Sequence, residues 1–318
     1  MSELVLGVGA SHTTLMNTQW EKVDHLPRAH AFRDGLAQAR GSLNSARPDA
    51  VVIIGSNHFR GFWLDLMPAF TIGVGEVISS GEHGTPAGEI RCDRQLGLSI
   101  CEYLQAHEFD IAFSDRLKID HGISHAYQWL LRDIDAPIVP LVINCFAPPL
   151  PTLRRSEKLG AALRAAILAI PDARRIAIIA TGGLSHSLPF PDWRRPNGSD
   201  EIFLANSWSV GRDNWQAFEQ RRRSILLSAA PRINPSFDEW FLQLLEADGL
   251  ADFGSRLSDE QLLSQAGNGG NEVRSWLALA SAMGNQAGRR IAYSPMPEWL
   301  TGMAVAVIEP NAISGECS

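Results

Sequence analysis

Three histidines share a local context that could place them at one site. Each stands four to six residues beyond a run of apolar and β-branched residues, after a short connection rich in small residues. They are His12 after Leu4–Val8, His58 after Ala50–Ile54 and His186 after Ile176–Ala180. Ligands of open α/β sheets bind beyond the carboxyl ends of the strands, so parallel strands would bring these imidazoles together. The alternative is three separate loop histidines, each solvated or hydrogen-bonded locally.

Glu272 is the carboxylate best placed to join two of these imidazoles. It follows the glycine-rich stretch Gly267–Asn271 and is expected to open a helix over Glu272–Met283. Two imidazoles and one carboxylate on one face suit Fe(II), because they leave positions free for substrate and dioxygen. The alternative role is purely structural, since a carboxylate in a first helical turn also stabilises the positive end of the helix dipole.

A fourth polar cluster, Asp120-His121-Gly122, could supply a proton donor. Histidine is the side chain best suited to move protons near neutral pH, so His121 could act as an acid while Asp120 orients it or ends a strand. No nucleotide-binding glycine fingerprint and no G-x-S-x-G serine elbow is complete. The remaining histidines without such a context are given no role: His25, His30, His83 and His107.

The elements that must position these residues alternate between strand and helix over the first 185 residues. Strands are expected at the three runs above and at Phe70–Val74 and Ile138–Ile143, all nearly continuous in apolar character. Helical patterns cover Arg28–Leu43, Arg94–His107, Ser156–Ala169, Phe237–Ala247 and Glu272–Met283. The alternation predicts an α/β fold, a central mostly parallel or mixed sheet flanked by helices.

The whole chain, residues 1–318, is interpreted as a single catalytic α/β domain. Residues 190–265 are polar and helix-prone and are expected to form a helical elaboration within it. The apolar run Met303–Ile308 is expected to return to the sheet, and the tail Pro310–Ser318 to be frayed.

Composition excludes several classes of protein. A formal net charge of −7 argues against a nucleic-acid partner, and the three arginine clusters at 154–155, 174–175 and 221–223 are interpreted as solvated helix faces or strand ends. None of the four cysteines forms a C-x-x-C pair, which fits a reducing cytoplasm. No apolar run approaches the roughly 18 residues of a membrane span, and no signal peptide is visible.

An ordered set of short motifs closely resembles the class III extradiol ring-cleaving dioxygenases, the superfamily of the protocatechuate 4,5-dioxygenase β subunit. The pattern is most similar to the branch that includes 2,3-dihydroxyphenylpropionate 1,2-dioxygenase. Single motifs are weakly specific, but the ordered set spans nearly the whole chain. The motifs are Ala10-Ser11-His12, Asn57-His58, Met67-Pro68-Ala69-Phe70 before Gly73-Val74-Gly75, Asp120-His121-Gly122, Pro149-Leu150-Pro151, Gly182-Gly183-Leu184-Ser185-His186, Asn234-Pro235, Glu272 with Trp276 beyond, and Pro295-Met296-Pro297-Glu298-Trp299.

The resemblance implies an enzyme that uses Fe(II) and dioxygen to open the ring of a small aromatic diol, giving a ring-opened semialdehyde or related product. It implies His12, His58 and Glu272 as iron ligands, His186 as general base and His121 as proton donor. Asn271 departs from the family pattern, in which a histidine precedes the glutamate, so that histidine cannot be required for metal binding. The family also implies a homo-oligomer, and in some members a small partner subunit.

Two other functions remain open from the residues alone. A metal-dependent hydrolase would use the same three ligands for zinc, because the ligand types do not exclude that metal. A non-catalytic binding protein on the same fold would have lost at least one of the five site residues, and all five are present. The ring substituent of a diol substrate is left undetermined.

Overall fold

The computed structural model describes residues 1–310, and nine strands in this range form one sheet. Cys317 and all of the predicted frayed tail except Pro310 lie outside the described residues. The sheet order is β4-β3-β6-β2-β7-β1-β9-β8, with β5 paired to β3. The strands are β1 (Glu3–Ala10), β2 (Ala50–Ser56), β3 (Phe70–Ser80), β4 (Ala87–Ile90), β5 (Ala112–Ile119), β6 (Ile138–Ile143), β7 (Arg175–Thr181), β8 (Arg289–Met296) and β9 (Thr301–Ile308).

The centre of the sheet is parallel and its margins are mixed. Strands β1, β7, β2 and β6 run parallel, whereas β3 is antiparallel to β6 and β9 is antiparallel to β1. The register sets Ala180 of β7 beside Gly9 of β1 on one side and Ile54 of β2 on the other. The carboxyl ends of these three strands are therefore level, and the predicted mixed α/β sheet is confirmed.

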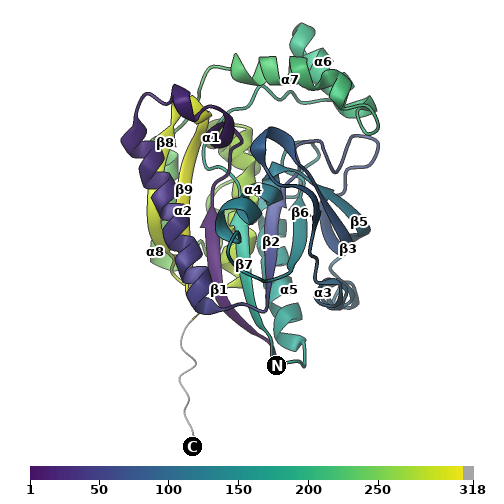
Figure 1. Cartoon of the computed structure of the whole chain (residues 1–318), viewed down its shortest axis with the longest axis vertical. Helices are drawn as coiled ribbons and strands as arrows, with labels where there is room; N and C mark the ends of the chain where they lie inside the picture. Colours follow the sequence, from purple (N-terminus) through teal and green to yellow (C-terminus); the bar gives the residue numbers. More distant parts are fainter. Residues whose placement is uncertain (311–318) are drawn as a thin grey trace, which may run out of the picture.

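Helices bury both faces of the sheet. Successive residues of β2 alternate between two apolar clusters, Val51 and Ile53 in one, Val52 and Ile54 in the other, and all four are inaccessible to solvent. Burial of each such side chain is worth about 1.5–3 kcal/mol. One face is covered by α2 (Leu26–Ala46) and α4 (His121–Leu130), which lie in front of the sheet in Figure 1. The other is covered by α3 (Arg94–Ala106), α5 (Leu153–Ala169) and α11 (Val273–Ala282).

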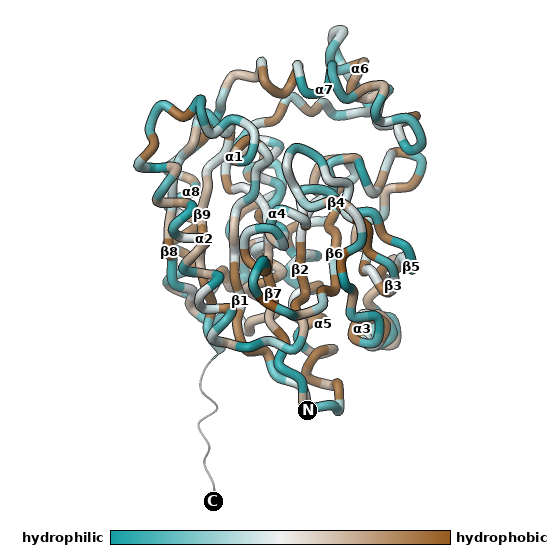
Figure 2. Tube along the Cα trace, in the orientation of Figure 1, coloured by the Kyte–Doolittle hydropathy of each residue, from teal (hydrophilic) through white to brown (hydrophobic). Residues whose placement is uncertain are grey.

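The hydropathy of the chain also differs between the central strands and the outer helices. The tube of β6 is largely brown in Figure 2, whereas the outer helix α2 alternates between teal and brown along its length. Within residues 1–310 no helix has both the length and the apolar content that a membrane crossing requires. Cys92, Cys101 and Cys145 are free thiols.

Between β7 and β8 the chain forms only helical elements. They are α6 (Gly198–Val210), α7 (Gln216–Leu227), α8 (Pro235–Asp248), α9 (Phe253–Arg256), α10 (Asp259–Ala266), the 3₁₀ turn η3 (Gly269–Glu272) and α11. Helices α6 and α7 lie at the top of Figure 1, beyond the carboxyl ends of the parallel strands. Glu272 ends η3 and precedes α11 without a side-chain capping hydrogen bond, so the helix expected over Glu272–Met283 begins one residue later.

Several elements lack a clear sequence signal. Strand β5 carries exposed and charged residues at the margin of the sheet, and β8 contains arginines and a proline. The short elements near the chain's loops are α1 (Leu15–Thr18), η1 (Trp20–Lys22), η2 (Glu82–Gly84) and η4 (Pro297–Trp299).

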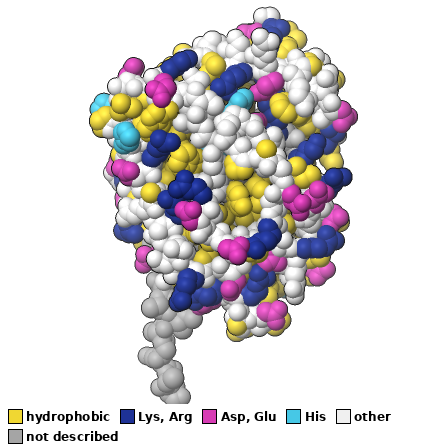
Figure 3. All heavy atoms as spheres, in the orientation of Figure 1, with side chains coloured by type: hydrophobic (Ala, Val, Ile, Leu, Met, Phe, Trp, Pro, Cys, Tyr) yellow, Lys and Arg dark blue, Asp and Glu magenta, His cyan; other side chains and the backbone are white. Residues whose placement is uncertain are grey.

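Acidic and basic side chains intermingle on the surface. The face drawn in Figure 3 carries dark blue and magenta side chains side by side. Two arginines of the clusters noted above are exposed and paired with acids, Arg175 with Glu3 at 2.5 Å and Arg221 with Asp200 at 2.9 Å. These two fit the interpretation as solvated positions.

Candidate active site

The level ends of β1, β2 and β7 bring the three expected histidines to one edge of the sheet. His12 and His58 stand two residues beyond β1 and β2, and His186 stands five residues beyond β7. All three side chains are buried. Glu272 reaches the same point from η3 and is 1% exposed. The structure thus gathers residues from both ends of the chain around one centre.

The Nε2 atoms of His12 and His58 face one carboxylate oxygen. Glu272 Oε1 lies 3.1 Å from His12 Nε2 and 3.5 Å from His58 Nε2. The opposite ring nitrogens are occupied, His12 Nδ1 by Thr181 Oγ1 at 2.6 Å and His58 Nδ1 by Asp120 Oδ1 at 3.3 Å. Adjacent ligands of a first-row metal ion lie roughly 3 Å apart, because each bond is about 2.1 Å long. Partners on the second ring nitrogen are typical of metal-binding histidines. The donor set therefore fits a metal ion.

Glu272 is held as a carboxylate. Ser56 Oγ donates to Oε1, and the backbone N–H of Gly183 donates to Oε2 at 2.8 Å. Burial alone would raise the pKa of Glu272, but His12 and His58 outweigh it and hold the pKa well below its ordinary value. Burial likewise opposes the charge of His58, yet Asp120 and Glu272 raise its pKa to about 10. The centre is therefore an environment that favours a cation.

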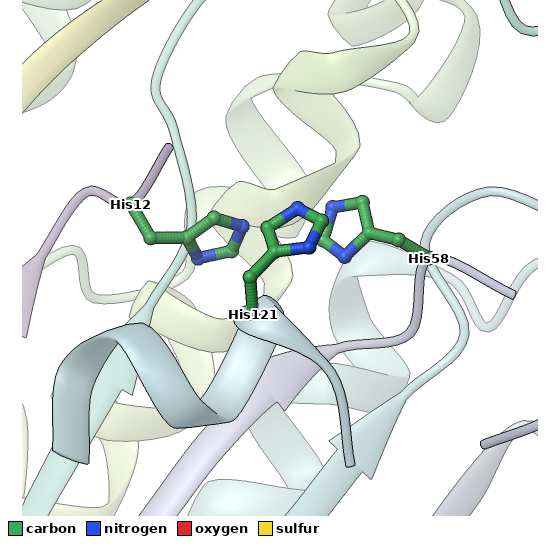
Figure 4. A group of neighbouring side chains, drawn as sticks. All are labelled: His12, His58 and His121. Atoms are coloured by element: carbon green, nitrogen blue, oxygen red, sulfur yellow. The ribbon is translucent and has the colours of Figure 1, made fainter. Parts of the chain in front are cut away.

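His121 projects into the same centre from the start of α4. Asp120 caps this helix by accepting from the N–H of Gly122 at 2.9 Å. The helix end approaches β2 closely, because a Cβ on Gly55 would lie 2.1 Å from the carbonyl oxygen of Gly122. Figure 4 shows the His121 ring beside those of His12 and His58, with ring centroids 5.4 Å and 3.9 Å away, respectively.

His121 contacts a different carboxylate from the one that the two expected histidine ligands face. One ring nitrogen of each of His12, His58 and His121 lies within 4.8 Å of the others, so position alone makes His121 a further possible ligand. Its ring stacks on that of His58, with ring centroids 3.9 Å apart and a 27° interplanar angle. His121 Nδ1 lies 2.5 Å from Glu82 Oε1. Burial and the nearby charge of His58 lower the pKa of His121 to about 4.

His186 presents a free nitrogen to the centre. Its Nδ1 donates to the carbonyl oxygen of Leu184 at 3.0 Å, while Nε2 lies 3.8 Å from Glu272 Oε2. Burial lowers the pKa of His186, so the imidazole is neutral near pH 7 and can accept a proton. Gly269 packs against this ring so closely that a Cβ there would lie 2.1 Å from Nε2.

A cavity opens from this centre toward α6 and α7. Its lining combines the five site residues with an apolar wall and a network of charged groups. The apolar wall includes Leu188, Pro189, Phe190, Leu204, Ile225, Leu226, Trp299 and Leu300. The charged groups are Arg60, Glu82, His83, Glu219, Arg222 and Arg223.

Sequence reasoning missed most of the charged network. Arg60 Nε lies 3.0 Å from Glu82 Oε2 and the same guanidinium contacts Glu219, while His83 Nε2 lies 3.0 Å from Glu219 Oε1. His83 was given no role, yet it lines the cavity. No motif surrounds Glu82, and its contact with His121 joins residues 39 positions apart. The interpretation of cluster 221–223 as solvated is wrong for Arg222, which is 9% exposed and faces the cavity.

Known proteins match nearly the whole chain. Residues 7–304 match the family described as the catalytic LigB subunit of aromatic ring-opening dioxygenase. A 2,3-dihydroxyphenylpropionate/2,3-dihydroxicinnamic acid 1,2-dioxygenase of Xanthobacter autotrophicus is 32% identical, over 95% of this chain and 97% of its own. A protein of the same name from Burkholderia vietnamiensis is 32% identical, over 87% and 89%.

A solved structure agrees at the level of the fold. The crystal structure of an uncharacterized protein from Escherichia coli K12 superposes with a TM-score of 0.52 at 16% identity, covering 96% of this chain and 99% of that one. The chain belongs to the family of the catalytic LigB subunit of aromatic ring-opening dioxygenases, the class III extradiol dioxygenases.

Proposed function

We propose that this protein is an extradiol dioxygenase that holds Fe(II) with His12, His58 and Glu272 and opens the ring of a catechol-type diol with dioxygen. The product would be a ring-opened semialdehyde or a related compound. The observation that carries the proposal is the approach of two imidazole Nε2 atoms to one carboxylate oxygen, at 3.1 Å and 3.5 Å, beside a cavity with an apolar wall. Two histidines and one carboxylate with open positions are typical of Fe(II) oxygenases. The names of the two relatives support the same reaction class.

The bound Fe(II) would lower the pKa of the diol hydroxyls and pass electron density from the diol, the electron source, to dioxygen. His186 would accept a proton from the diol at Nε2, because Nδ1 is held by the carbonyl of Leu184. That transfer leaves the ring electron-rich and ready to react.

His121 would deliver a proton later in the reaction. With a pKa of about 4 it is neutral at pH 7, so it must first take up a proton at Nε2. Glu82, fixed by Arg60, stands at Nδ1 and would stabilise the imidazolium formed in this way. The apolar wall would limit the access of water to the centre while these transfers occur.

Replacing each proposed ligand tests the metal site. His12→Ala, His58→Ala and Glu272→Ala are each expected to lose iron while keeping the circular dichroism spectrum of the parent, because the ion would keep only two protein ligands. Arg221→Gln, at an exposed position, is the matched control. Full iron occupancy in any of the three variants would remove that residue from the ligand set.

Activity assays test the reaction class. The parent, loaded anaerobically with Fe(II), is expected to consume one dioxygen per catechol and to form a yellow ring-opened product. Hydrolysis of esters by the zinc-loaded protein, with no catechol cleavage by the Fe(II) form, would replace the proposal with the hydrolase alternative. Neither activity, with intact metal binding, would favour a non-catalytic binding protein.

We also propose a cytoplasmic location and a homo-oligomer, with a small partner subunit as a further possibility that purification from the source cell would test. The three described cysteines are free thiols, which supports a reducing compartment. A single monomeric mass by light scattering would contradict the oligomer.

A further inference from the structure

Arg222 on α7 is a buried cation without an acidic partner. Its Nη2 donates to the carbonyl oxygen of His58 at 3.2 Å, while Nη1 is buried and has no hydrogen-bond partner. Among residues 1–310, no carboxylate oxygen lies within 4.0 Å of its side-chain nitrogens. Burial and the charge of Arg60 lower the pKa of Arg222 to about 10, so the group is still charged at neutral pH.

The nearby acids are already engaged elsewhere. Glu82 contacts Arg60 and His121, and Glu219 contacts Arg60 and His83. A buried guanidinium with an unused donor is costly unless an anion pairs with it. Glu219, Glu82 and Asp120 act on Arg222 only at longer range, and within residues 1–310 none of them forms a direct ion pair with it. The guanidinium can therefore still accept a directly bound anionic ligand.

Arg222 also lines the cavity that opens from the proposed metal centre. It lines the same cavity as His12 and Glu272, and its bond to the backbone of His58 places it next to the proposed iron site. Ile225 and Leu226 follow it by three and four positions, so they share its face of α7 and extend the apolar wall.

We propose that Arg222 binds a carboxylate carried by the ring substituent of the substrate, at the end of a short apolar chain. This inference rests on the proposed function, because the diol must lie at the iron for the substituent to reach α7. A planar guanidinium matches a carboxylate better than an ammonium group does. The apolar wall suits the intervening carbons, and Arg222 would then be a residue that determines specificity.

Paired substrates test this role. Catechols with the same short chain, ending either in a carboxylate or in the corresponding uncharged amide, are compared in the Fe(II)-loaded parent, Arg222→Gln, Arg222→Lys and Arg221→Gln. The parent should prefer the carboxylate. Arg222→Gln should lose roughly 10- to 100-fold in kcat/KM for the carboxylate and little for the amide, because a charge-assisted hydrogen bond is removed. Arg222→Lys should recover part of the loss, and the exposed control Arg221→Gln should match the parent on both substrates.

A binding measurement separates failure of this inference from failure of the proposed function. A phenyl ring with the same carboxylate chain but no diol has nothing to cleave, and its binding is followed by calorimetry. Arg222-dependent binding without catechol cleavage would sink the proposed function and keep an anion site. Cleavage of both catechols with no preference for the charged one would keep the enzyme and overturn the inference. Equal losses on both catechols in Arg222→Gln would also overturn it, by making Arg222 a support for the His58 backbone.

Discussion

Replacing Gly269 with alanine would press a methyl group against the ring of His186. An ideal Cβ at this position lies 2.1 Å from both Cδ2 and Nε2 of that ring, whereas ordinary contact begins at 3.4 Å. The ring or the η3 turn must therefore move by about 1.3 Å. Displacements near 1 Å in a catalytic geometry cost about 100-fold in rate, or about 2.7 kcal/mol of activation free energy. We expect Gly269→Ala to lower kcat by about that factor.

Turnover and iron content are measured together, because Glu272 ends the same turn. Iron retained with slow turnover means that the ring moved, and iron lost means that the turn moved. Gly41→Ala is the matched control, since an added Cβ there meets no atom within 4 Å and lies on the exposed side of α2. Parental kcat and full iron in Gly269→Ala would refute the placement of His186 against this glycine.

Three further predictions address the metal, the proton transfers and pH. Peroxide should abolish activity by oxidising Fe(II), and reductant with added Fe(II) should restore it; undiminished turnover after complete oxidation would argue for another metal. His186→Phe and His121→Phe should each keep iron but slow turnover by about 10²–10⁴-fold. Rapid mixing with oxygen should show that His186→Phe is slowed before the ring is activated and that His121→Phe is slowed after it. Slowing of both variants at the same step would contradict the two roles. Burial raises the pKa of Asp238 to about 6, so the folded chain holds this proton more tightly than the unfolded chain. The stability that the protonated carboxyl contributes below about pH 4 is lost as pH rises through 6. Between these pH values, the free energy of unfolding of Asp238→Asn should therefore rise relative to that of the parent by up to about 3 kcal/mol. The same difference in free energy of unfolding between the two proteins at pH 4 and at pH 7.5 would contradict this.

Local signals in the sequence were sufficient for the parts of the site that follow strand ends. His12, His58 and His186 were predictable because each connection is short and the strands before them are strongly apolar. The parallel register then brings them together without further information. Glu272 was predictable because a glycine-rich stretch precedes it, although its 3₁₀ turn was not expected.

Contacts made by long-range packing were beyond sequence reasoning. Periodicity identifies a helix but does not say which of three consecutive arginines faces inward, and Arg222 is buried only because α7 lies over the cavity. Glu82 meets His121 through a turn with no motif of its own. Strand β8 carries arginines and Pro295, and its place in the sheet depends on its pairing with β9.

The insertion of β1 between β7 and β9 gives the site an order of assembly during synthesis. Strand β1 cannot take its final place until residues 175–181 and 301–308 have been made. His12 precedes Glu272 by 260 residues, which corresponds to roughly 13 to 52 s of translation at 5–20 residues per second. During that interval the early histidines would have no carboxylate partner from η3. Stable capture of the metal would thus report synthesis through Glu272, and a chain that ends before Glu272 should leave the ribosome unable to retain the ion.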